Sequence, residues 1–246
     1  MKSSCTKKCI GILGGMGPEA TVLLMTQIIK LTPARDDSDH VPLIIDNNTQ
    51  VPSRIQALIE NSGADPGPVL QQMAIKLELN GAQALAMPCN TAHYYAGLIQ
   101  DAVQIPFLNM IELCAILVSS YRLKNKTVGV LGSPAVRRLG LFDDVFSRQA
   151  IDVIYPQNQP LMLKAIRAIK SDSRDNEARW IFKQACQELS DKGADILLVG
   201  CSEFSIISDA IPETLRYIDT IDVLAQTVVD FASGNKICET AHSQPA

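Results

Sequence analysis

A hydrophobic, strand-like run that ends in a cysteine occurs twice in this chain, once in each half, and constrains the fold more than any other feature. The first run leads to Cys89 and the second to Cys201. Each follows a similar glycine-ended run: Cys89 comes 77 positions after Ile12, and Cys201 comes 71 positions after Val130. A repeat of this length predicts two similar lobes and not a solenoid of short repeats.

Apolar runs typical of strands alternate with helical segments along the whole chain. We expect strands near 8–14, 41–46, 84–88, 107–109, 126–132, 151–155, 196–200 and 217–219, and main helices near 18–31, 68–80, 135–148, 161–171, 176–192 and 221–232. Continuous apolar strands between helices are typical of parallel sheets covered on both faces. The predicted fold class is therefore α/β, with two similar doubly wound parallel-sheet lobes related by a pseudo-twofold duplication and an active site in the cleft between them.

The segments that begin at Phe107 and Tyr217 each lead into an apolar helix. We therefore expect the chain to cross between lobes near Met110 and again near 211–215. This assigns residues 1–109 plus 213–246 to the first lobe and residues 110–212 to the second, with the last helix packed on the first lobe.

Charge and cysteine content exclude several classes of partner. The formal net charge of −4 disfavours nucleic acid, because a phosphate backbone is bound by clustered Lys and Arg. No apolar run approaches the roughly 20 residues that span a bilayer, and the polar N-terminus has no signal-peptide core. Seven cysteines without an export signal favour a reducing compartment over a disulfide framework. We expect a cytoplasmic protein with no nucleic-acid or membrane partner.

The two cysteines are expected where the carboxyl ends of parallel strands meet helix N-termini, which is where open α/β sheets bind ligands. A thiol in that place is favoured as thiolate by the helix dipole and the free backbone N–H groups. Asn90, Thr91 and Ser202 add donors for a small carboxylate. Two sulfurs that attack one carbon from opposite faces should lie roughly 7 Å apart with the substrate between them.

Three segments carry a family resemblance that extends over about residues 10–231. They are 12–18 (ILGGMGP), 87–93 (MPCNTAH) and 200–203 (GCSE). Together they resemble the aspartate racemase branch of the aspartate/glutamate racemase family. The resemblance implies a racemase without pyridoxal phosphate, metal or other cofactor, in which Cys89 and Cys201 are the two bases. It also implies a homodimer, and Glu203 at a position where glutamate racemases commonly have His favours aspartate as the substrate.

The resemblance also implies a set of substrate-binding residues. Arg54 and Lys170 correspond to contacts with the side-chain carboxylate of the substrate, and an arginine fork suits that group because it can donate two parallel hydrogen bonds. The other expected substrate-binding residues are Met16, Gln50, Asn90, Thr91, Ser133, Ser202 and Glu203. Two positions depart from the family pattern, since Val136 replaces a second hydroxyl residue after Ser133 and Ser202 replaces the usual Thr.

Other interpretations stay open at the level of sequence. The hydantoin racemase and maleate isomerase reactions of the same superfamily also use two cysteines, and a non-catalytic amino-acid binding protein can share the two-lobed shape. The sequence does not decide between aspartate, glutamate and other substrates, nor which cysteine acts on which enantiomer.

Three local patterns suggest different chemistry and are disfavoured. Residues 15–20 fit the dinucleotide-binding pattern G-x-G-x-x-A, but the acidic residue Asp46 lies 29 positions after Gly17 instead of about 20. His93 could pair with Cys89 as in a cysteine hydrolase, although a structural role is the better interpretation. Cys5 and Cys9 have no second ligand pair, which argues against a zinc site.

Overall fold

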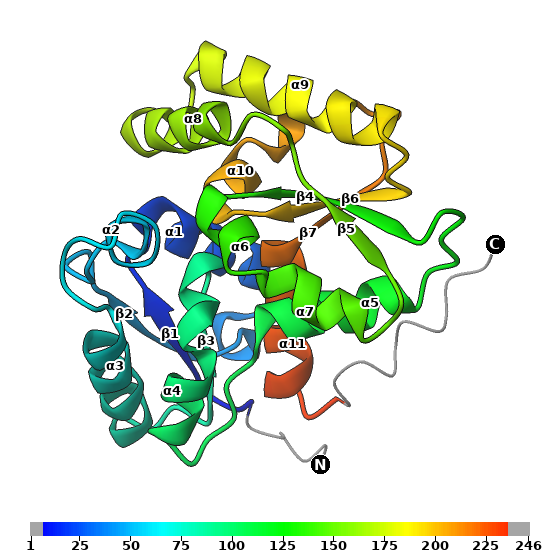
Figure 1. The fold of residues 1–246 in the computed structure, drawn as a ribbon. Helices are drawn as coiled ribbons and strands as arrows, with labels where there is room; N and C mark the ends of the chain where they lie inside the picture. Colours follow the sequence, from blue (N-terminus) through cyan, green and yellow to red (C-terminus); the bar gives the residue numbers. More distant parts are fainter. Residues whose placement is uncertain (1–6, 236–246) are drawn as a thin grey trace.

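The computed structural model describes residues 7–235, which form two parallel sheets (Figure 1). The first has the strand order β2-β1-β3 and the second β5-β4-β6-β7. Their bounds are β1 (Ile10–Gly14), β2 (Leu43–Asn47), β3 (Ala84–Ala86), β4 (Thr127–Gly132), β5 (Asp152–Ile154), β6 (Ile196–Gly200) and β7 (Tyr217–Asp219). In the first sheet, a parallel bridge joins Leu85 of β3 to Phe107. This bridge has the position that β7 has beside β6 in the second sheet. Both halves therefore have the same strand order, and the predicted α/β class with two similar parallel-sheet lobes is confirmed.

Eleven α-helices and three 3-10 turns connect the strands of the described part of the chain. The helices are α1 (Pro18–Leu31), α2 (Arg54–Leu58), α3 (Gly67–Leu79), α4 (Ala96–Asp101), α5 (Met110–Ser119), α6 (Pro134–Arg138), α7 (Leu141–Ser147), α8 (Gln159–Ser171), α9 (Asn176–Asp191), α10 (Ser202–Ile206) and α11 (Thr220–Ala232); the 3-10 turns are η1 (Asp37–Asp39), η2 (Thr91–Tyr95) and η3 (Ser208–Ala210). In the second lobe, α8 and α9 lie on one side of the sheet and α5 and α7 on the other (Figure 1).

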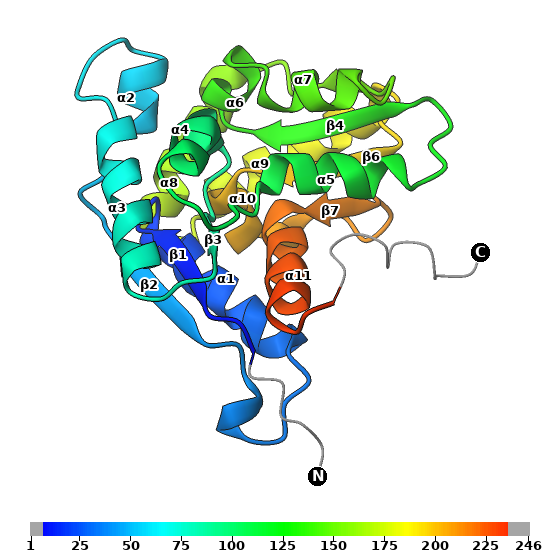
Figure 2. The same cartoon turned by 90° about the horizontal axis from the view of Figure 1, so that it is seen from below.

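A central core joins the two lobes. Alternate residues of a strand point to opposite faces, so Val128 and Val130 of β4 enter the central core while Leu131 enters the core beneath α8 and α9. Ile10 and Ile12 of β1 also belong to the central core. The helix α11 packs between α1 and α5 in this core (Figure 2). The inner faces of both sheets are therefore buried in one apolar cluster, which sets the position of one lobe against the other.

Local sequence signals explain where several helices begin. Pro18 is the first residue of α1, as predicted, because a helix start needs no N–H there. Asn109 caps α5 by accepting from the backbone N–H of Ile111 at 3.0 Å, and Asp219 caps α11 by accepting from Ile221 at 2.9 Å. These two caps occupy equivalent positions in the two halves.

The prediction of one helix near 135–148 is wrong. Two short helices, α6 and α7, occupy this segment and are separated at Gly140, which has a φ angle of +61°. Glycine adopts this left-handed conformation without the steric penalty of a Cβ atom, so the first helix ends there.

The end of the second half also differs from the expected crossing near 211–215. The strand at Tyr217–Asp219 is present, but it pairs with β6 and so extends the second sheet. Only with α11, which packs against α1, does the chain return to the first lobe. Apart from the position of β7, the division into residues 1–109 plus 213–246 and residues 110–212 stays a prediction. Residues 1–6, which include Cys5, and residues 236–246 lie outside the part of the chain that the structure describes.

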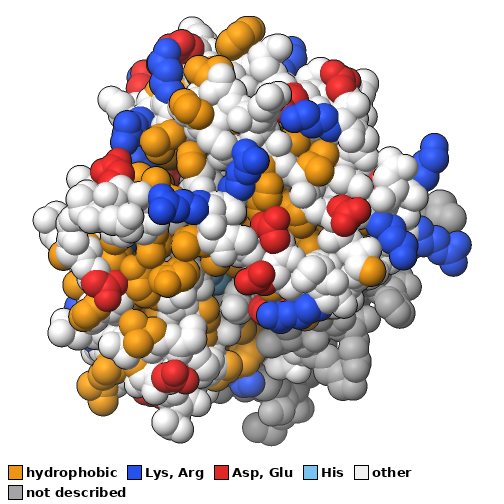
Figure 3. All heavy atoms as spheres, in the orientation of Figure 1, with side chains coloured by type: hydrophobic (Ala, Val, Ile, Leu, Met, Phe, Trp, Pro, Cys, Tyr) orange, Lys and Arg blue, Asp and Glu red, His pale blue; other side chains and the backbone are white. Residues whose placement is uncertain are grey.

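The surface carries both charges and local apolar patches. Within residues 7–235, no helix is both long and apolar enough to cross a bilayer. Figure 3 shows Lys, Arg, Asp and Glu side chains scattered over one face, while hydrophobic side chains gather at its lower left, around α3 and α4. Ile75 and Leu79 on α3 and Leu98 on α4 are exposed.

Candidate active site

Both cysteines lie at the carboxyl ends of strands that neighbour the central strand of their sheet. Cys201 directly follows β6 and is the N-cap residue of α10, and Cys89 lies between β3 and the 3-10 turn η2. The exposed fraction is 7% for Cys89 and 5% for Cys201. The two thiols therefore occupy equivalent, buried positions at the ligand-binding edges of the two sheets.

The residue after each cysteine forms a hydrogen bond with the other half of the chain. The hydroxyl of Ser202 donates to the carbonyl oxygen of Pro88, immediately before Cys89, at 2.7 Å. The Nδ2 amide of Asn90 donates to Oγ1 of Thr220, the residue that follows β7, at 3.1 Å. The two cysteine loops are thus joined to each other and to the start of α11.

The second residue after each cysteine also contacts the other half of the chain. Oγ1 of Thr91 lies 3.0 Å from Oγ of Ser133, which follows β4. Glu203 lies beside Gly17, which follows β1, since a Cβ atom at Gly17 would be 3.8 Å from Oε1 of Glu203. Four equivalent loops, two from each half, therefore meet at the interface between the lobes. The sulfur separation expected with substrate bound, about 7 Å, stays a prediction.

Cys201 is held in its protonated form by its surroundings. Burial, followed by the negative charge of Glu203, raises the pKa of the Cys201 thiol well above its usual value. The sulfur donates to Oε2 of Glu203 at 3.1 Å, and Oε1 of Glu203 lies 3.3 Å from Nζ of Lys170, which offsets part of the effect. The expectation that the helix N-terminus favours the thiolate form of Cys201 is wrong for the protein without substrate, because desolvation and an adjacent carboxylate outweigh the helix dipole. Cys201 is arranged as a proton donor.

A cavity of about 380 Å³ opens between the lobes beside these residues. It is formed by the loops after β1 and β2 in the first lobe and by α8 and α10 in the second. The lining residues include Gly17, Thr49, Ser53, Arg54, Lys170 and Glu203. The volume suits a small molecule. Neither cysteine lines the cavity, but Glu203, which does, accepts a hydrogen bond from the thiol of Cys201.

Arg54 provides a positively charged group in the wall of this cavity. Its Nη1 atom donates to the carbonyl oxygens of Val51 at 3.2 Å and Pro52 at 2.8 Å. These bonds hold the guanidinium at the start of α2, whose first turn is capped by Ser53, as predicted. Since a guanidinium has five N–H donors, two bonds from one nitrogen leave others for a carboxylate.

Six of the nine expected substrate-binding residues do not line the cavity. Gln50 is exposed, and its side chain donates to Thr49 at 3.2 Å. Met16 is 3% exposed and packs in the core with Val51, although its glycine neighbours reach the cavity. Asn90, Thr91, Ser133 and Ser202 are buried among the loops that join the halves.

Sequence reasoning missed Thr49, Ser53 and Thr220 as parts of the site. Thr49 and Ser53 lie close to Arg54 in the sequence and line the same cavity, so the assignment of Arg54 was the signal that could have found them. Thr220 had no local signal, because its role as the acceptor for Asn90 depends on a contact between segments 130 positions apart.

His93 has a structural role beside Cys89. Its Nε2 atom accepts from the backbone N–H of Met110 at 3.1 Å, so the ring hydrogen is on Nδ1, which lies 2.9 Å from the carbonyl oxygen of Cys89. Burial lowers the pKa of His93 to about 4. A neutral ring bonded to the carbonyl, and not to the thiol, argues against the cysteine hydrolase interpretation.

We expect His93 to make the protein less stable in acid. The unfolded state binds a proton below about pH 6.5 while the folded state stays neutral down to about pH 4, so stability is present above this window and is lost as the pH falls through it. Relative to His93→Gln, the free energy of unfolding of the original protein should fall by about 3 kcal/mol between pH 7 and pH 4. Urea unfolding at several pH values measures this difference, and parallel pH profiles of the two proteins would contradict it.

Comparisons with known proteins identify a family for this chain. A family model described as Asp/Glu/Hydantoin racemase matches residues 13–228. The structure is similar to that of an aspartate racemase from Picrophilus torridus, with a TM-score of 0.82 and 29% identity over 95% of this chain and 97% of that one. A broad-specificity amino-acid racemase of Bacillus subtilis, RacX, is 28% identical over 225 residues, which are 89% of this chain and 96% of RacX.

More distant relatives share the fold. The glutamate racemase isoform RacE1 of Bacillus anthracis has a TM-score of 0.66 and 19% identity, covering 89% of this chain and 79% of that one. Because the family model spans nearly the whole described chain, this protein belongs to the Asp/Glu/Hydantoin racemase family.

Proposed function

We propose that the protein interconverts the L and D forms of a small acidic amino acid, with aspartate as the preferred substrate, by proton transfer between Cys89 and Cys201. The observation that carries this proposal is the contact between the two cysteine loops, in which Ser202 donates to Pro88, while Asn90 donates to Thr220 at the start of α11. This contact supports a substrate position shared by one thiol from each half, as inversion at a single carbon requires.

The two cysteines have complementary roles in the proposed reaction. The raised pKa of Cys201 favours it as the thiol that donates a proton to one face of the α-carbon, and Cys89 is then the base that removes the α-proton from the other face. After one turnover the roles are exchanged, and the reverse reaction uses Cys201 as the base. In that direction the negative charge of the Cys201 thiolate would lie 3.1 Å from the carboxylate of Glu203. Lys170, which pairs with Glu203, offsets the resulting repulsion.

The cavity supports an acidic substrate. Arg54 and Lys170 can bind the side-chain carboxylate, since both line the cavity. The hydroxyls of Thr91 and Ser133, 3.0 Å apart, and the amide of Asn90 are the proposed partners of the amino-acid end. No cofactor or metal takes part in this proposal, and the homodimer remains a proposal for which the exposed apolar residues of α3 and α4 are a candidate surface.

A broader substrate range is the second candidate, favoured by the similarity to RacX along 96% of its length. In that case Arg54 would accelerate the reaction of acidic substrates without excluding neutral ones.

A racemisation screen tests the proposal. Each free amino acid is incubated in one enantiomeric form, and the enantiomers are separated by chiral chromatography. A hydantoin and maleate are tested in separate incubations as alternative substrates. We expect aspartate to be the fastest substrate. Conversion of several neutral amino acids at similar rates supports the second candidate, whereas no interconversion of any amino acid would contradict both.

A further inference from the structure

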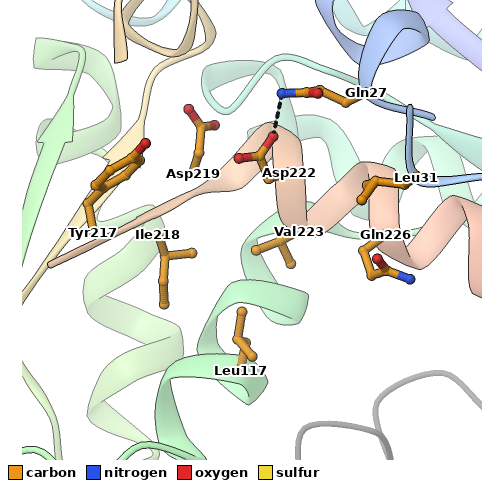
Figure 4. A pocket seen from close by; sticks show the side chains of 9 residues that line it. All are labelled: Gln27, Leu31, Leu117, Tyr217, Ile218, Asp219, Asp222, Val223 and Gln226. Atoms are coloured by element: carbon orange, nitrogen blue, oxygen red, sulfur yellow. Dashed lines mark hydrogen bonds between the residues drawn. The ribbon is translucent and has the colours of Figure 1, made fainter. Parts of the chain in front are cut away.

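A second cavity, separate from the candidate active site, lies at the junction of α1, α5, β7 and α11 (Figure 4). Its volume is about 540 Å³. No residue of the proposed reaction lines it, so its chemistry is not accounted for by the candidate active site.

The lining of this cavity is divided into a polar and an apolar side. Asp219, Asp222, Gln27 and Gln226 provide carboxyl and amide groups. Figure 4 shows the carboxyl groups of Asp219 and Asp222 next to each other, with Nε2 of Gln27 donating to Asp222 at 2.9 Å. The remaining lining is mainly aliphatic and includes Leu31, Leu117 and Val223. A ligand that fits both sides has one polar, charged end and a short hydrocarbon chain.

The polar side favours a positively charged ligand. Asp219 is 5% exposed, and its Oδ1 atom accepts from Oγ of Ser205 at 2.7 Å and from the backbone N–H of Ile221. Neither Asp219 nor Asp222 takes part in any ion pair found among residues 7–235. The charge of Lys30 on α1 acts to lower the pKa of Asp222, although the two residues form no ion pair among residues 7–235.

The two carboxyl groups are costly to ionise together. Burial, and then the charge of Asp222, raises the pKa of Asp219 to about 7, and burial also raises the pKa of Asp222. A cation placed between them would stabilise both in their ionised forms, because an opposite charge within a few ångströms offsets desolvation and repulsion.

This cavity is connected to the cysteines by short hydrogen-bonded paths. Ser205, which donates to Asp219, belongs to α10, and its own backbone N–H donates to the carbonyl oxygen of Cys201 at 3.2 Å. The residue after Asp219 is Thr220, which accepts from Asn90 in the loop of Cys89. A change at Asp219 therefore acts on the start of α10 through one side chain.

We propose that this cavity binds a small organic cation, a primary ammonium on a short aliphatic chain, and that its occupancy is transmitted to Cys201 through Asp219 and Ser205. The ammonium lies between the carboxylates of Asp219 and Asp222, and the chain lies against Leu117 and Val223. The proposal rests on the cavity and its contacts and does not require the proposed racemase reaction.

Binding is tested by calorimetry with pentylamine, using pentanol and pentanoate as probes of equal length that are neutral or anionic. We expect pentylamine to bind at least ten-fold more tightly than either, and Asp222→Asn to weaken it at least five-fold. Asp101→Asn, an exposed position on α4 away from the cavity, is the matched control and should bind normally. Gln226→Lys, which places a tethered ammonium at the exposed rim, should also weaken binding. Equal binding of the three probes, or unchanged binding by Asp222→Asn, overturns the site.

Transmission is tested by the rate at which iodoacetamide alkylates Cys201, followed by peptide mass spectrometry. Saturating pentylamine should slow this rate several-fold in the original protein but not in Ser205→Ala, which should still bind the amine because Ser205 does not line the cavity. A rate unchanged by bound pentylamine overturns the transmission. Because neither readout uses racemisation, failure here is distinguishable from failure of the proposed function.

Discussion

Replacing Cys89 or Cys201 with serine is expected to reduce racemisation of aspartate about 1000-fold or more, and by a similar factor for both. Each turnover needs one sulfur to remove a proton and the other to supply one, so neither thiol can replace its partner. A general acid or base typically contributes 10²–10⁴-fold to the rate of a reaction. A serine hydroxyl cannot replace the thiolate as the base, because it is not ionised near neutral pH. The double variant should lose little more than either single variant, because residues that act as a unit are not additive.

Chiral chromatography at early times measures these rates. Cys9→Ser is the matched control, because Cys9 is only partly buried and lies outside the site at the start of β1. It should stay within about two-fold of the original protein, in keeping with the small effect of most substitutions outside a site. Full activity of either catalytic variant would exclude a two-cysteine mechanism, and activity in Cys201→Ser alone, with a covalent adduct on Cys89, would indicate a hydrolase instead.

Arg54→Ala is expected to lower kcat/KM for aspartate about 100-fold or more. Hydrogen bonds to charged groups contribute about 1.5–3 kcal/mol each, so losing a two-point contact with the side-chain carboxylate removes at least about 3 kcal/mol. Arg54→Lys should restore only part of the activity, because an ammonium cannot reproduce the planar fork of the guanidinium.

Arg174→Ala provides the comparison for this prediction, since the Arg174 side chain is 89% exposed and contacts only Asp172 among the ion pairs of the described chain. Its kcat/KM should be unchanged. If Arg54→Ala keeps both the rate with aspartate and the preference for acidic over neutral amino acids, Arg54 does not bind the substrate side chain.

Local features of the fold were predictable because local signals determine them. Pro18 marks the start of α1, and Ser53 caps α2, as the sequence indicated. The break at Gly140 was missed because an isolated glycine within an apolar pattern does not reveal its φ angle. The sheet that receives β7 depends on packing between distant segments, which neighbouring residues do not encode.

The candidate site divides in the same way. The duplicated motif was enough to place Cys89 and Cys201 at equivalent strand ends. The charge state of Cys201 was not predictable from the helix position alone, because burial and the orientation of Glu203 toward the sulfur reverse the effect of the helix dipole. The family resemblance placed Gln50 in the site, whereas its side chain is exposed.

The most direct test of the two-sulfur mechanism is the position of deuterium after partial conversion of L-aspartate in heavy water. Each inversion should remove the α-proton to one cysteine and add a solvent-derived deuteron from the other. We therefore predict that, at early times, the D-aspartate formed carries deuterium at the α-carbon while the remaining L-aspartate retains protium. Formation of D-aspartate that retains the original proton, or equal labelling of both enantiomers from the start, would contradict transfer between two opposed thiols.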